Sequence, residues 1–294
     1  CVKLVKEISI KIKYYYYMQI EDLSIIIVTY KSEGKIFNCL NSIPDNIKVI
    51  VVENSNNKNF KKQIEESYPN VNCILTGSNK GYASANNVGL KKVTSKYALV
   101  LNPDTVLGKD AVNNFFVTIK KIKDFWIVGP GNDQYDYYHF EKSDVIEVNH
   151  VKGFAIFLNL QKFNNKYFDE NYFLYFEEID LCKRLKNNNG KIFLDKSIII
   201  RHEGSSSVDR TNQHELEKNR NWHWMWSTFY FNKKHNGFIH ALIIILPKLF
   251  SSVLKTLFYI FLNKKEKRDI YYSRLSGIIN SIIGKKSWYR PSLD

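Results

Sequence analysis

Residues Leu23–Tyr30 read LSIIIVTY, a run of apolar and β-branched side chains that ends in two polar residues. A strand that is buried on both faces of a sheet has this continuous apolar character. Similar runs follow along the chain at Val49–Val52, Val71–Leu75 and Ala98–Leu101. We therefore expect four buried strands in the first hundred residues.

Stretches with helical character separate these four runs, at Glu33–Ser42, Lys58–Ser67 and Gly81–Val93. Strands that alternate with helices at this spacing indicate βαβ units and a mainly parallel sheet. Ligands bind to such sheets in the crevice beyond the carboxyl ends of the strands. The sequence therefore predicts an α/β fold whose functional residues follow the strands.

The composition fits a globular protein and narrows its partners. The chain has 294 residues, of which 44% are hydrophobic and 24% charged, and this excludes wholesale disorder. Its four cysteines lie far apart with no CxxC pair, so we expect neither a zinc ribbon nor a disulfide framework, and a reducing compartment is favoured. The net charge is +14, but the lysines are spread along the chain rather than gathered on one motif, so we expect no nucleic-acid partner.

Polar residues follow each of the four predicted strands, and the loop after the third leads into a predicted helix whose free N–H groups suit phosphate or ribose contact. Neither GxGxxG nor GxxxxGK[ST] occurs, which excludes dinucleotide-binding and P-loop sites. The candidate ligand-binding residues in this half are Thr29, Tyr30, Glu53, Asn54, Ser55, Asn79, Gly81, Asn86, Asn102 and Asp104.

The motifs IIIVTY, VVENS, NKGYASANNVGL and LNPD occur in this order at successive strand ends. Together they resemble the nucleotide-sugar-binding half of family 2 glycosyltransferases, which have the GT-A fold. The NPD form is similar to rhamnosyltransferase-type members that build bacterial surface polysaccharides. The resemblance implies that Asp104 holds a divalent cation, Mg²⁺ or Mn²⁺, on the donor diphosphate. Asn102 then replaces the first Asp of the family's DxD motif, and Glu53, where most relatives carry Asp, contacts the nucleobase or ribose.

Two further segments mark a second half. His150–Leu158 (HVKGFAIFL) reads as a strand, with Gly153 as a candidate donor contact where a ligand or backbone approaches closely. Three carboxylates then crowd into four residues at Glu177, Glu178 and Asp180, where mutual repulsion raises at least one pKa. Acidic residues also favour a helix N-terminus, so a structural role stays open.

The segment YFLYFEEIDLCKRL resembles the family's FxxYFEDxDLCxRL motif. In the family the second acidic residue is the catalytic base, which implies that role for Glu178, although the family usually has Asp there. Asp180 is the alternative base, or orients Arg184 or an acceptor hydroxyl. Arg184 lies one helical turn after Asp180 and is a further candidate donor contact.

Ile198–Ile200 is predicted to be a short strand, and His202 follows it. The resemblance implies that His202 is a metal ligand or a diphosphate contact. A structural role for this histidine stays open. Gly204–Gln213 is predicted to be a loop that closes over the donor. Asn219–His235 is predicted to be an aromatic helix whose tryptophans lie in the core rather than forming a platform for a sugar.

The two ends of the chain differ from its centre. Residues 1–17 precede Met18, the first methionine, and we interpret them as an upstream extension or a short arm. We expect a GT-A domain over 18–235, with a nucleotide-binding half at 18–130 and an acceptor half at 131–235, and a basic helical region at 236–294. Ala241–Leu262 is long enough to cross a bilayer, but Pro247, Lys248 and Lys255 interrupt it. A helix lying in the membrane interface is favoured, and a soluble packed helix or a true span stays open.

The resemblance implies an inverting glycosyltransferase that moves a sugar from a nucleoside-diphosphate sugar to a hydroxyl of a glycan or lipid-linked glycan. The subgroup suggests deoxythymidine-diphosphate rhamnose as the donor. We expect a cytoplasmic enzyme bound peripherally at the inner face of the membrane. A non-catalytic sugar-nucleotide-binding relative and a nucleotidyltransferase are the alternatives.

Overall fold

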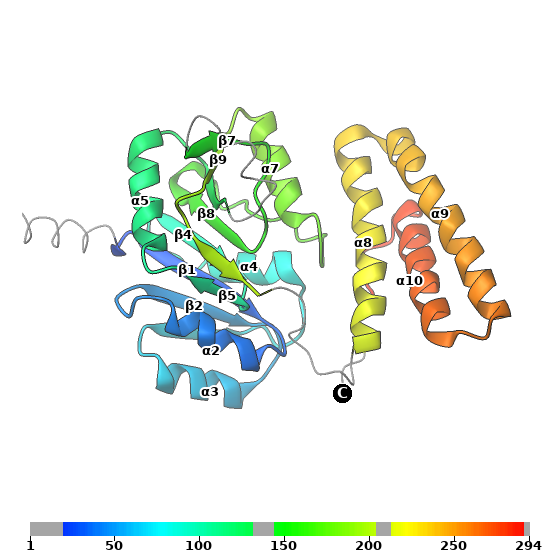
Figure 1. Cartoon of the computed structure of the whole chain (residues 1–294), viewed down its shortest axis with the longest axis horizontal. Helices are drawn as coiled ribbons and strands as arrows, with labels where there is room; N and C mark the ends of the chain where they lie inside the picture. The colour runs from blue at the N-terminus through cyan, green and yellow to red at the C-terminus, as the bar shows by residue number, and fades with distance from the viewer. Residues whose placement is uncertain (1–19, 132–143, 204–212, 291–294) are drawn as a thin grey trace, which may run out of the picture. The chain divides into compact units, whose positions relative to one another are not determined.

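The computed structural model describes residues 20–131, 144–203 and 213–290. The predicted extension at 1–17 and nearly all of the predicted loop Gly204–Gln213 lie outside these residues. The described chain forms two compact units. The first comprises residues 20–80, 85–168 and 181–203 within the described ranges and is built on a sheet, whereas the second comprises 81–84, 169–180 and 213–290 and is helical (Figure 1).

The sheet of the first unit has eight strands in the order β3-β2-β1-β4-β8-β6-β9-β7. The pairs of β1 with β2, β2 with β3, β1 with β4 and β6 with β9 are parallel, and the other three pairs are antiparallel. The strands are β1 (Leu23–Thr29), β2 (Lys48–Glu53), β3 (Val71–Leu75), β4 (Tyr97–Leu101), β6 (Ile127–Pro130), β7 (Val145–Glu147), β8 (Ala155–Asn159) and β9 (Ile192–Asp195). The predicted α/β sheet is confirmed as a mixed sheet whose first four strands are parallel.

Helices flank this sheet. They are α2 (Glu33–Asn41), α3 (Lys58–Ser67), α4 (Tyr82–Leu90), α5 (Ala111–Ile122) and α7 (Glu177–Asn187), with a short 3₁₀ turn η1 (Leu160–Lys162). The first residues of α4 and α7 belong to the second unit. All four strands and all three helices predicted in the first hundred residues are present, with ends shifted by no more than three residues.

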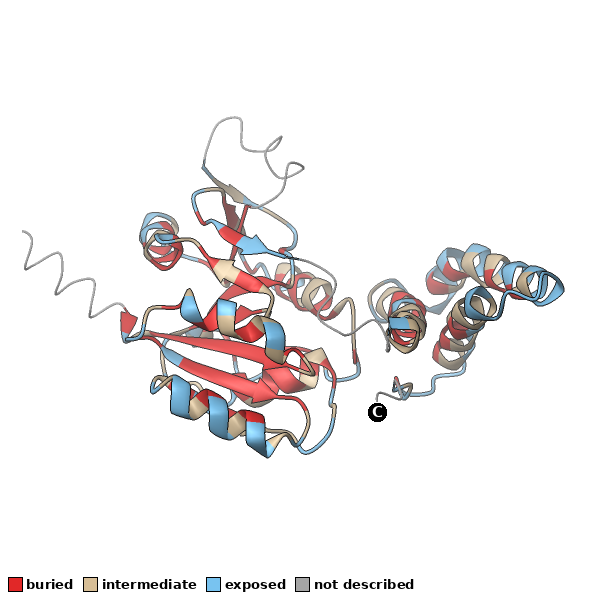
Figure 2. Ribbon diagram, turned by 60° about the horizontal axis from the view of Figure 1, so that its bottom comes forward, coloured by how far each residue is buried: buried red, intermediate tan, exposed pale blue. Residues whose placement is uncertain are grey.

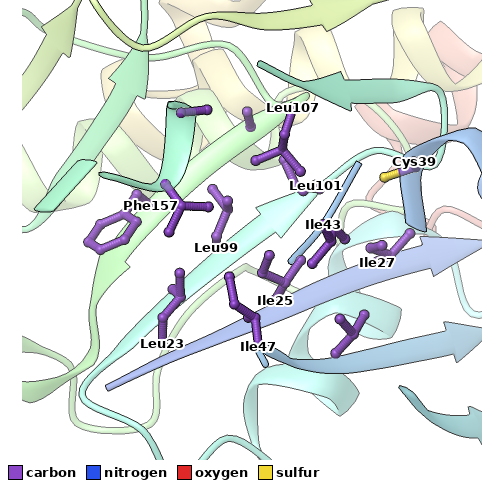
Figure 3. Close-up of a cluster of buried hydrophobic side chains, with 14 of the residues drawn as sticks. Leu23, Ile25, Ile27, Cys39, Ile43, Ile47, Leu99, Leu101, Leu107 and Phe157 are labelled. Carbon is purple, nitrogen blue, oxygen red and sulfur yellow. The ribbon is translucent and has the colours of Figure 1, made fainter. Parts of the chain in front are cut away.

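Alternation along β1 divides its side chains between the two faces of the sheet. Leu23, Ile25 and Ile27 point into one buried cluster together with apolar residues of α2, α3 and α5 (Figure 3). On the other face Ile26 meets α4, where a Cβ added at Gly89 would lie 2.6 Å from the Ile26 Cγ2 atom. The sheet is therefore buried on both sides, as Figure 2 shows by the red strands between helices with blue outer surfaces.

Two predicted strands have different bounds in the structure. β8 begins at Ala155 rather than His150, and Gly153 lies in the turn that precedes it. The second predicted strand, Ile198–Ile200, is instead β10 (Ile200–His202), which pairs antiparallel with β5 (Thr105–Leu107). Each strand starts where a partner becomes available, and that partner is distant in sequence, so the local pattern could not fix these starts.

The second unit contains the long helices α8 (Gln213–Asn236), α9 (Phe238–Phe261) and α10 (Lys265–Ile282). Met225 and Phe229 of α8 pack with Ala241 and Ile245 of α9 and with Ile278 of α10. The predicted aromatic helix Asn219–His235 is thus confirmed as part of α8.

The tryptophans of α8 divide between its core and its surface. Trp222 and Trp226 are buried, as predicted, but Trp224 is 45% exposed, so the prediction that all three lie in the core is wrong for Trp224. Residues 222 and 226 share a helix face because they are four positions apart, whereas 224 lies roughly opposite them.

Candidate active site

Several candidate donor-binding residues lie side by side at the carboxyl ends of the parallel strands. Thr29 of β1 lies opposite Glu53 of β2 in the sheet register. The Asn54 N–H donates to the Thr29 carbonyl oxygen at 2.8 Å, and the Asn54 side chain donates to Asn79 Oδ1 at 3.0 Å. Asn54 Oδ1 in turn accepts the Lys80 N–H at 2.9 Å. Asn54 therefore joins the loops that follow β2 and β3.

Glu53 is buried and its carboxylate holds the turn before α3. One carboxylate oxygen accepts the Ser55 hydroxyl at 2.7 Å, and the other accepts the N–H groups of Ser55 at 3.2 Å and Asn57 at 3.0 Å. Since these hydrogen bonds are internal, the contact of Glu53 with a nucleobase or ribose stays a prediction. Tyr30 follows β1 and is half-buried, whereas Asn86 is fully buried within α4.

Gly81 occupies a position that only glycine fits. Its φ is +82°, and an added Cβ would lie 2.5 Å from the Phe173 carbonyl oxygen. The N–H of Tyr82, the first residue of α4, donates to this same oxygen at 2.8 Å. The expectation that free N–H groups at this helix start receive phosphate is therefore not met at Tyr82, because that donor is used within the protein.

Asp104 and His202 lie together at the end of β4. His202 Nε2 is 3.3 Å from Asp104 Oδ1, and the pairing of β10 with β5 sets His202 opposite Thr105, the residue after Asp104. The Phe154 ring stacks on the imidazole with centroids 4.9 Å apart and planes at 8°. The structure thus joins the two residues that the sequence nominated as metal ligands.

The charges around Asp104 keep it ionised. Partial burial works to raise the pKa of this carboxyl, but the hydrogen bond and charge of His202 and the charge of Lys35 outweigh it, so the pKa is lowered. An ionised carboxylate beside an imidazole suits a divalent cation such as Mn²⁺.

Asn102 adds a third possible ligand. No described residue forms a hydrogen bond with its buried Oδ1 atom, so this oxygen is left for a water molecule or an ion. The described ranges contain no group of three or more His, Cys, Asp or Glu side chains placed to hold one ion. The residues present therefore fit a cation that completes its ligand set with oxygens of the donor and of water.

Glu177 and Glu178 open α7, which fits the preference of acidic residues for a helix N-terminus. Burial raises the pKa of both carboxyl groups, and the charge of Glu178 adds to the effect on Glu177. Glu177 is buried, and within the described chain its Oε2 atom has no hydrogen-bond partner, whereas Glu178 is half-buried. Glu178 is therefore the more accessible of these two carboxyl groups.

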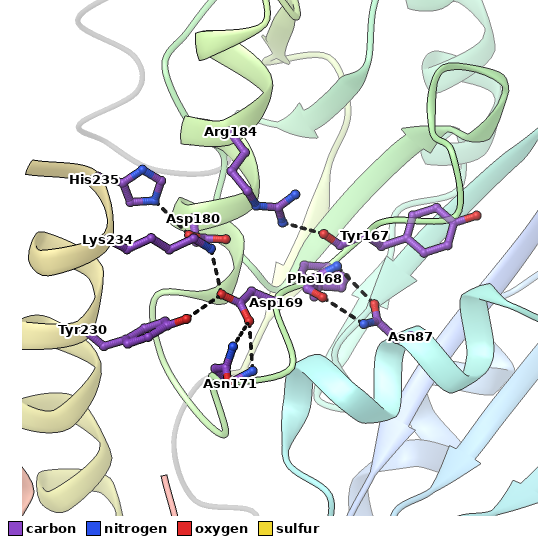
Figure 4. Close-up of polar contacts among 10 residues, drawn as sticks. All are labelled: Asn87, Tyr167, Phe168, Asp169, Asn171, Asp180, Arg184, Tyr230, Lys234 and His235. Carbon is purple, nitrogen blue, oxygen red and sulfur yellow. Dashed lines mark hydrogen bonds and ion pairs between the residues drawn. The ribbon is translucent and has the colours of Figure 1, made fainter. Parts of the chain in front are cut away.

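Asp180 is held by α8 (Figure 4). Its side chain is fully buried, and its Oδ1 atom lies 2.7 Å from Lys234 Nζ and 2.8 Å from His235 Nε2. Lys234 also contacts Asp169 Oδ2 at 2.7 Å, and the Tyr230 hydroxyl donates to the same oxygen at 3.1 Å. Sequence reasoning missed Lys234 and His235 because more than fifty positions separate them from Asp180 and no local pattern signals the contact.

Arg184, which the sequence suggested as a partner of Asp180, donates a hydrogen bond to the Tyr167 carbonyl oxygen in the first unit (Figure 4). Three cysteines of the described chain, Cys39, Cys73 and Cys182, are buried thiols that form no disulfide. Burial raises the pKa of the Cys39 thiol to about 11, so this thiol is not a nucleophile at neutral pH.

Comparisons with known proteins agree with this fold. Residues 24–182, more than half of the chain, match the family model described as glycosyl transferase family 2. The chain is 27% identical over 197 residues to the low-salt glycan biosynthesis hexosyltransferase Agl10 of Haloferax volcanii, covering 58% of this chain but only 63% of that protein. It is 24% identical over 252 residues to an uncharacterized glycosyltransferase of Haemophilus influenzae, covering 79% of this chain and 97% of that protein.

Solved structures give the same fold at low identity. The mannosyltransferase PcManGT from Pyrobaculum calidifontis, in complex with GDP-Man and Mn²⁺, aligns with a TM-score of 0.54 and 12% identity over 90% of this chain and 88% of that one. Residues 1–349 of S. aureus TarS align with a TM-score of 0.52 and 17% identity over 91% and 93%. The sheet and its flanking helices are those of the GT-A class. Within that class, the chain belongs to glycosyltransferase family 2.

Proposed function

We propose that this protein is an inverting glycosyltransferase that transfers a sugar from a nucleoside-diphosphate donor to a hydroxyl of a glycan. The observation that carries the proposal is the Asp104–His202 pair beyond β4. Two positions before Asp104 in the chain, the Asn102 Oδ1 atom has no hydrogen-bond partner among the described residues. This combination is what a diphosphate-bound cation needs from the protein.

On the donor side, Asp104 and His202 would hold the cation, with Asn102 as the third candidate. A divalent cation bound there would neutralise the charge that develops on the departing diphosphate. PcManGT was solved with GDP-Man and Mn²⁺, and TarS 1–349 with UDP-GlcNAc, which supports a nucleotide sugar as the donor class here. Deoxythymidine-diphosphate rhamnose, which the NPD motif suggested, is one member of that class.

On the acceptor side, Glu178 would take the proton from the attacking hydroxyl. Burial raises the pKa of Glu178 toward neutral pH. A carboxylate with a higher pKa is a stronger base, so it accepts the proton of the hydroxyl with a larger driving force. Asp180 suits this role less well, because its carboxylate is fully buried against Lys234 and His235. Asp180 would instead fix the start of α7 that carries Glu178.

We further propose that α9 binds the protein to a membrane surface. Of the described helices, α9 alone is long and apolar enough to cross a bilayer, and little of it is buried. Its exposed apolar side chains recur every three or four residues, as on one face of a helix. This stripe consists of Ile239, Ile243, Leu246, Phe250, Leu254, Leu257 and Phe261.

The remainder of α9 argues for a helix that lies in the interface. Ala241 and Ile245 on its other face pack with α8 and α10, so the helix is two-sided. Lys264, Lys265 and Lys267 follow its end and are exposed, which suits anionic headgroups. A cytoplasmic membrane face with a lipid-linked glycan as acceptor fits both features.

Flotation with liposomes tests the membrane proposal. Wild type should float with vesicles that contain phosphatidylglycerol, and a Leu254→Glu, Leu257→Glu variant should remain at the bottom. Val117→Glu, an exposed apolar site in α5, is the matched control and should float. Equal flotation of the double variant would overturn this part of the proposal.

A donor panel tests the transferase itself. Guanosine, uridine and deoxythymidine diphosphate sugars are compared by thermal shift and by slow hydrolysis, each with and without Mn²⁺. We expect one donor to raise the melting temperature in the presence of Mn²⁺ and to be hydrolysed. Binding without hydrolysis or transfer would favour the non-catalytic relative, for which Asn102 in place of a carboxylate is the supporting feature, and no binding would refute the proposal.

A further inference from the structure

Trp224 is exposed in a helix whose other tryptophans are buried. Its indole meets the Tyr175 ring edge-on at 5.2 Å between centroids and the Phe176 ring at 5.4 Å. These two aromatic residues immediately precede Glu177 and Glu178 in the chain. An exposed tryptophan thus lies against the segment that leads into the proposed base.

The backbone at Tyr175 and Phe176 is strained. Their φ angles are 71° and 72°, in the left-handed region that side chains other than glycine rarely enter. Two consecutive residues of this kind persist only when the surroundings fix them, and such strain gathers at ligand-binding and catalytic sites. Here Trp224 and Phe231 pack against Phe176, whose carbonyl oxygen accepts the Asp180 N–H at the start of α7.

Polar groups border the same aromatic surface. Arg220 lies one turn before Trp224 on α8. Burial raises the pKa of the Tyr175 hydroxyl, and the positive charge of Arg220 works against this shift. Arg220 Nη1 is 3.4 Å from Glu217 Oε1, and both side chains are more than a third exposed. The exposed indole of Trp224 and the Tyr175 ring supply apolar contact area, and the exposed Arg220–Glu217 pair one and two turns earlier on α8 supplies hydrogen-bonding groups.

We infer that Trp224, Tyr175 and Arg220 form a subsite for one sugar unit of the acceptor glycan. A pyranose ring has an apolar C–H face that packs on an aromatic plane, and hydroxyls at its rim that need donors and acceptors. The subsite rests on the proposed function, since it assigns the acceptor-binding surface next to Glu178. It commits the acceptor to a carbohydrate rather than to a peptide or a simple alcohol.

Ligand-observed NMR tests this assignment directly. The probes are the methyl glycosides of glucose, galactose, N-acetylglucosamine and rhamnose, and the variants are Trp224→Ala and Trp224→Phe. We expect wild type to transfer saturation to the ring protons of at least one glycoside, Trp224→Ala to lose that signal, and Trp224→Phe to retain part of it. Trp288→Ala is the matched control, because Trp288 is 53% exposed in the same unit but contacts Trp222 and Tyr289 instead.

Kinetics give the second readout once a donor is in hand. With the bound glycoside as acceptor, the ratio of transfer to donor hydrolysis should fall at least tenfold in Trp224→Ala and should be unchanged in Trp288→Ala. The subsite would be overturned if Trp224→Ala kept the wild-type saturation transfer, or if it kept the wild-type ratio of transfer to hydrolysis. It would also be overturned if wild type bound none of the glycosides at tens of millimolar. Wild type that neither binds nor hydrolyses any donor would instead refute the proposed function, so the two failures are distinguishable.

Discussion

His202 Nε2 lies 3.3 Å from Asp104 Oδ1, although the two residues are far apart in the chain. The short β5–β10 pairing brings the two residues together, and the Phe154 ring stacks on the imidazole of His202 and so fixes its plane. A carboxylate and an imidazole that meet only through tertiary structure beyond the end of β4 are the strongest structural support for a cation-dependent donor site.

Asp104→Asn should weaken donor binding in the presence of Mn²⁺ by roughly 10- to 100-fold, because a charged ligand contact contributes about 1.5–3 kcal/mol. Isothermal titration with the donor measures the change. Glu203→Gln is the control, since Glu203 follows His202 directly and its side chain is 50% exposed. Undiminished Mn²⁺-dependent donor affinity in Asp104→Asn would show that this carboxylate is not a ligand.

The pH dependence of kcat/KM should report the raised pKa of Glu178. A carboxylate acts as a base only in its ionised form, so kcat/KM should rise about tenfold per pH unit on the acid side. The ordinary pKa of a glutamate is 4.5, and because the pKa of Glu178 is raised, the plateau should begin only above pH 4.5. The profile is measured with the donor at low concentration, alongside thermal melts that exclude acid unfolding. A plateau that begins at or below pH 4.5 would contradict the assignment.

Gly81→Ala should lower the free energy of unfolding by at least about 2 kcal/mol, because alanine must adopt a left-handed φ and its Cβ would press on the Phe173 carbonyl. Urea unfolding measures the loss. Gly34→Ala is the control, since Gly34 lies in α2 with nothing within 4 Å of an added Cβ, and should gain about 0.5–1 kcal/mol. Equal effects at the two positions would refute the steric argument.

Lys234→Met should destabilise the second unit, because it leaves the buried Asp180 carboxylate with His235 as its remaining α8 partner. We expect a loss of about 1–2 kcal/mol, less than for a fully buried pair since the Lys234 side chain is 26% exposed. Lys233→Met, next to it on α8, provides the comparison in thermal melts. The interpretation fails when both variants melt at the wild-type temperature.

Local sequence pattern was enough for the first half of the fold. The runs at Leu23–Tyr30 and Val49–Val52 are apolar on both faces, so they had to be central strands, and their parallel pairing places Thr29 beside Glu53. The helix that begins at Glu177 could also be predicted from the sequence, because three acidic residues at its start fit both the helix dipole and the family motif.

Contacts between distant residues could not be read in this way. The start of β8 at Ala155 and of β10 at Ile200 depend on partner strands, and the Lys234–Asp180 contact depends on how α8 packs within its unit. The exposure of Trp224 could have been predicted from the sequence. Trp224 lies two positions from both Trp222 and Trp226, so it cannot share their helix face.

The most direct test of the central claim is the rate of donor hydrolysis by wild type, Glu178→Asp and Glu178→Gln with Mn²⁺ present. A glycosyltransferase that uses Glu178 as its base should lose roughly 10²–10⁴-fold of its rate in Glu178→Gln, with donor affinity unchanged, and should keep measurable turnover in Glu178→Asp. Glu178→Gln that hydrolyses the donor as fast as wild type would contradict the account and move the base to another carboxylate.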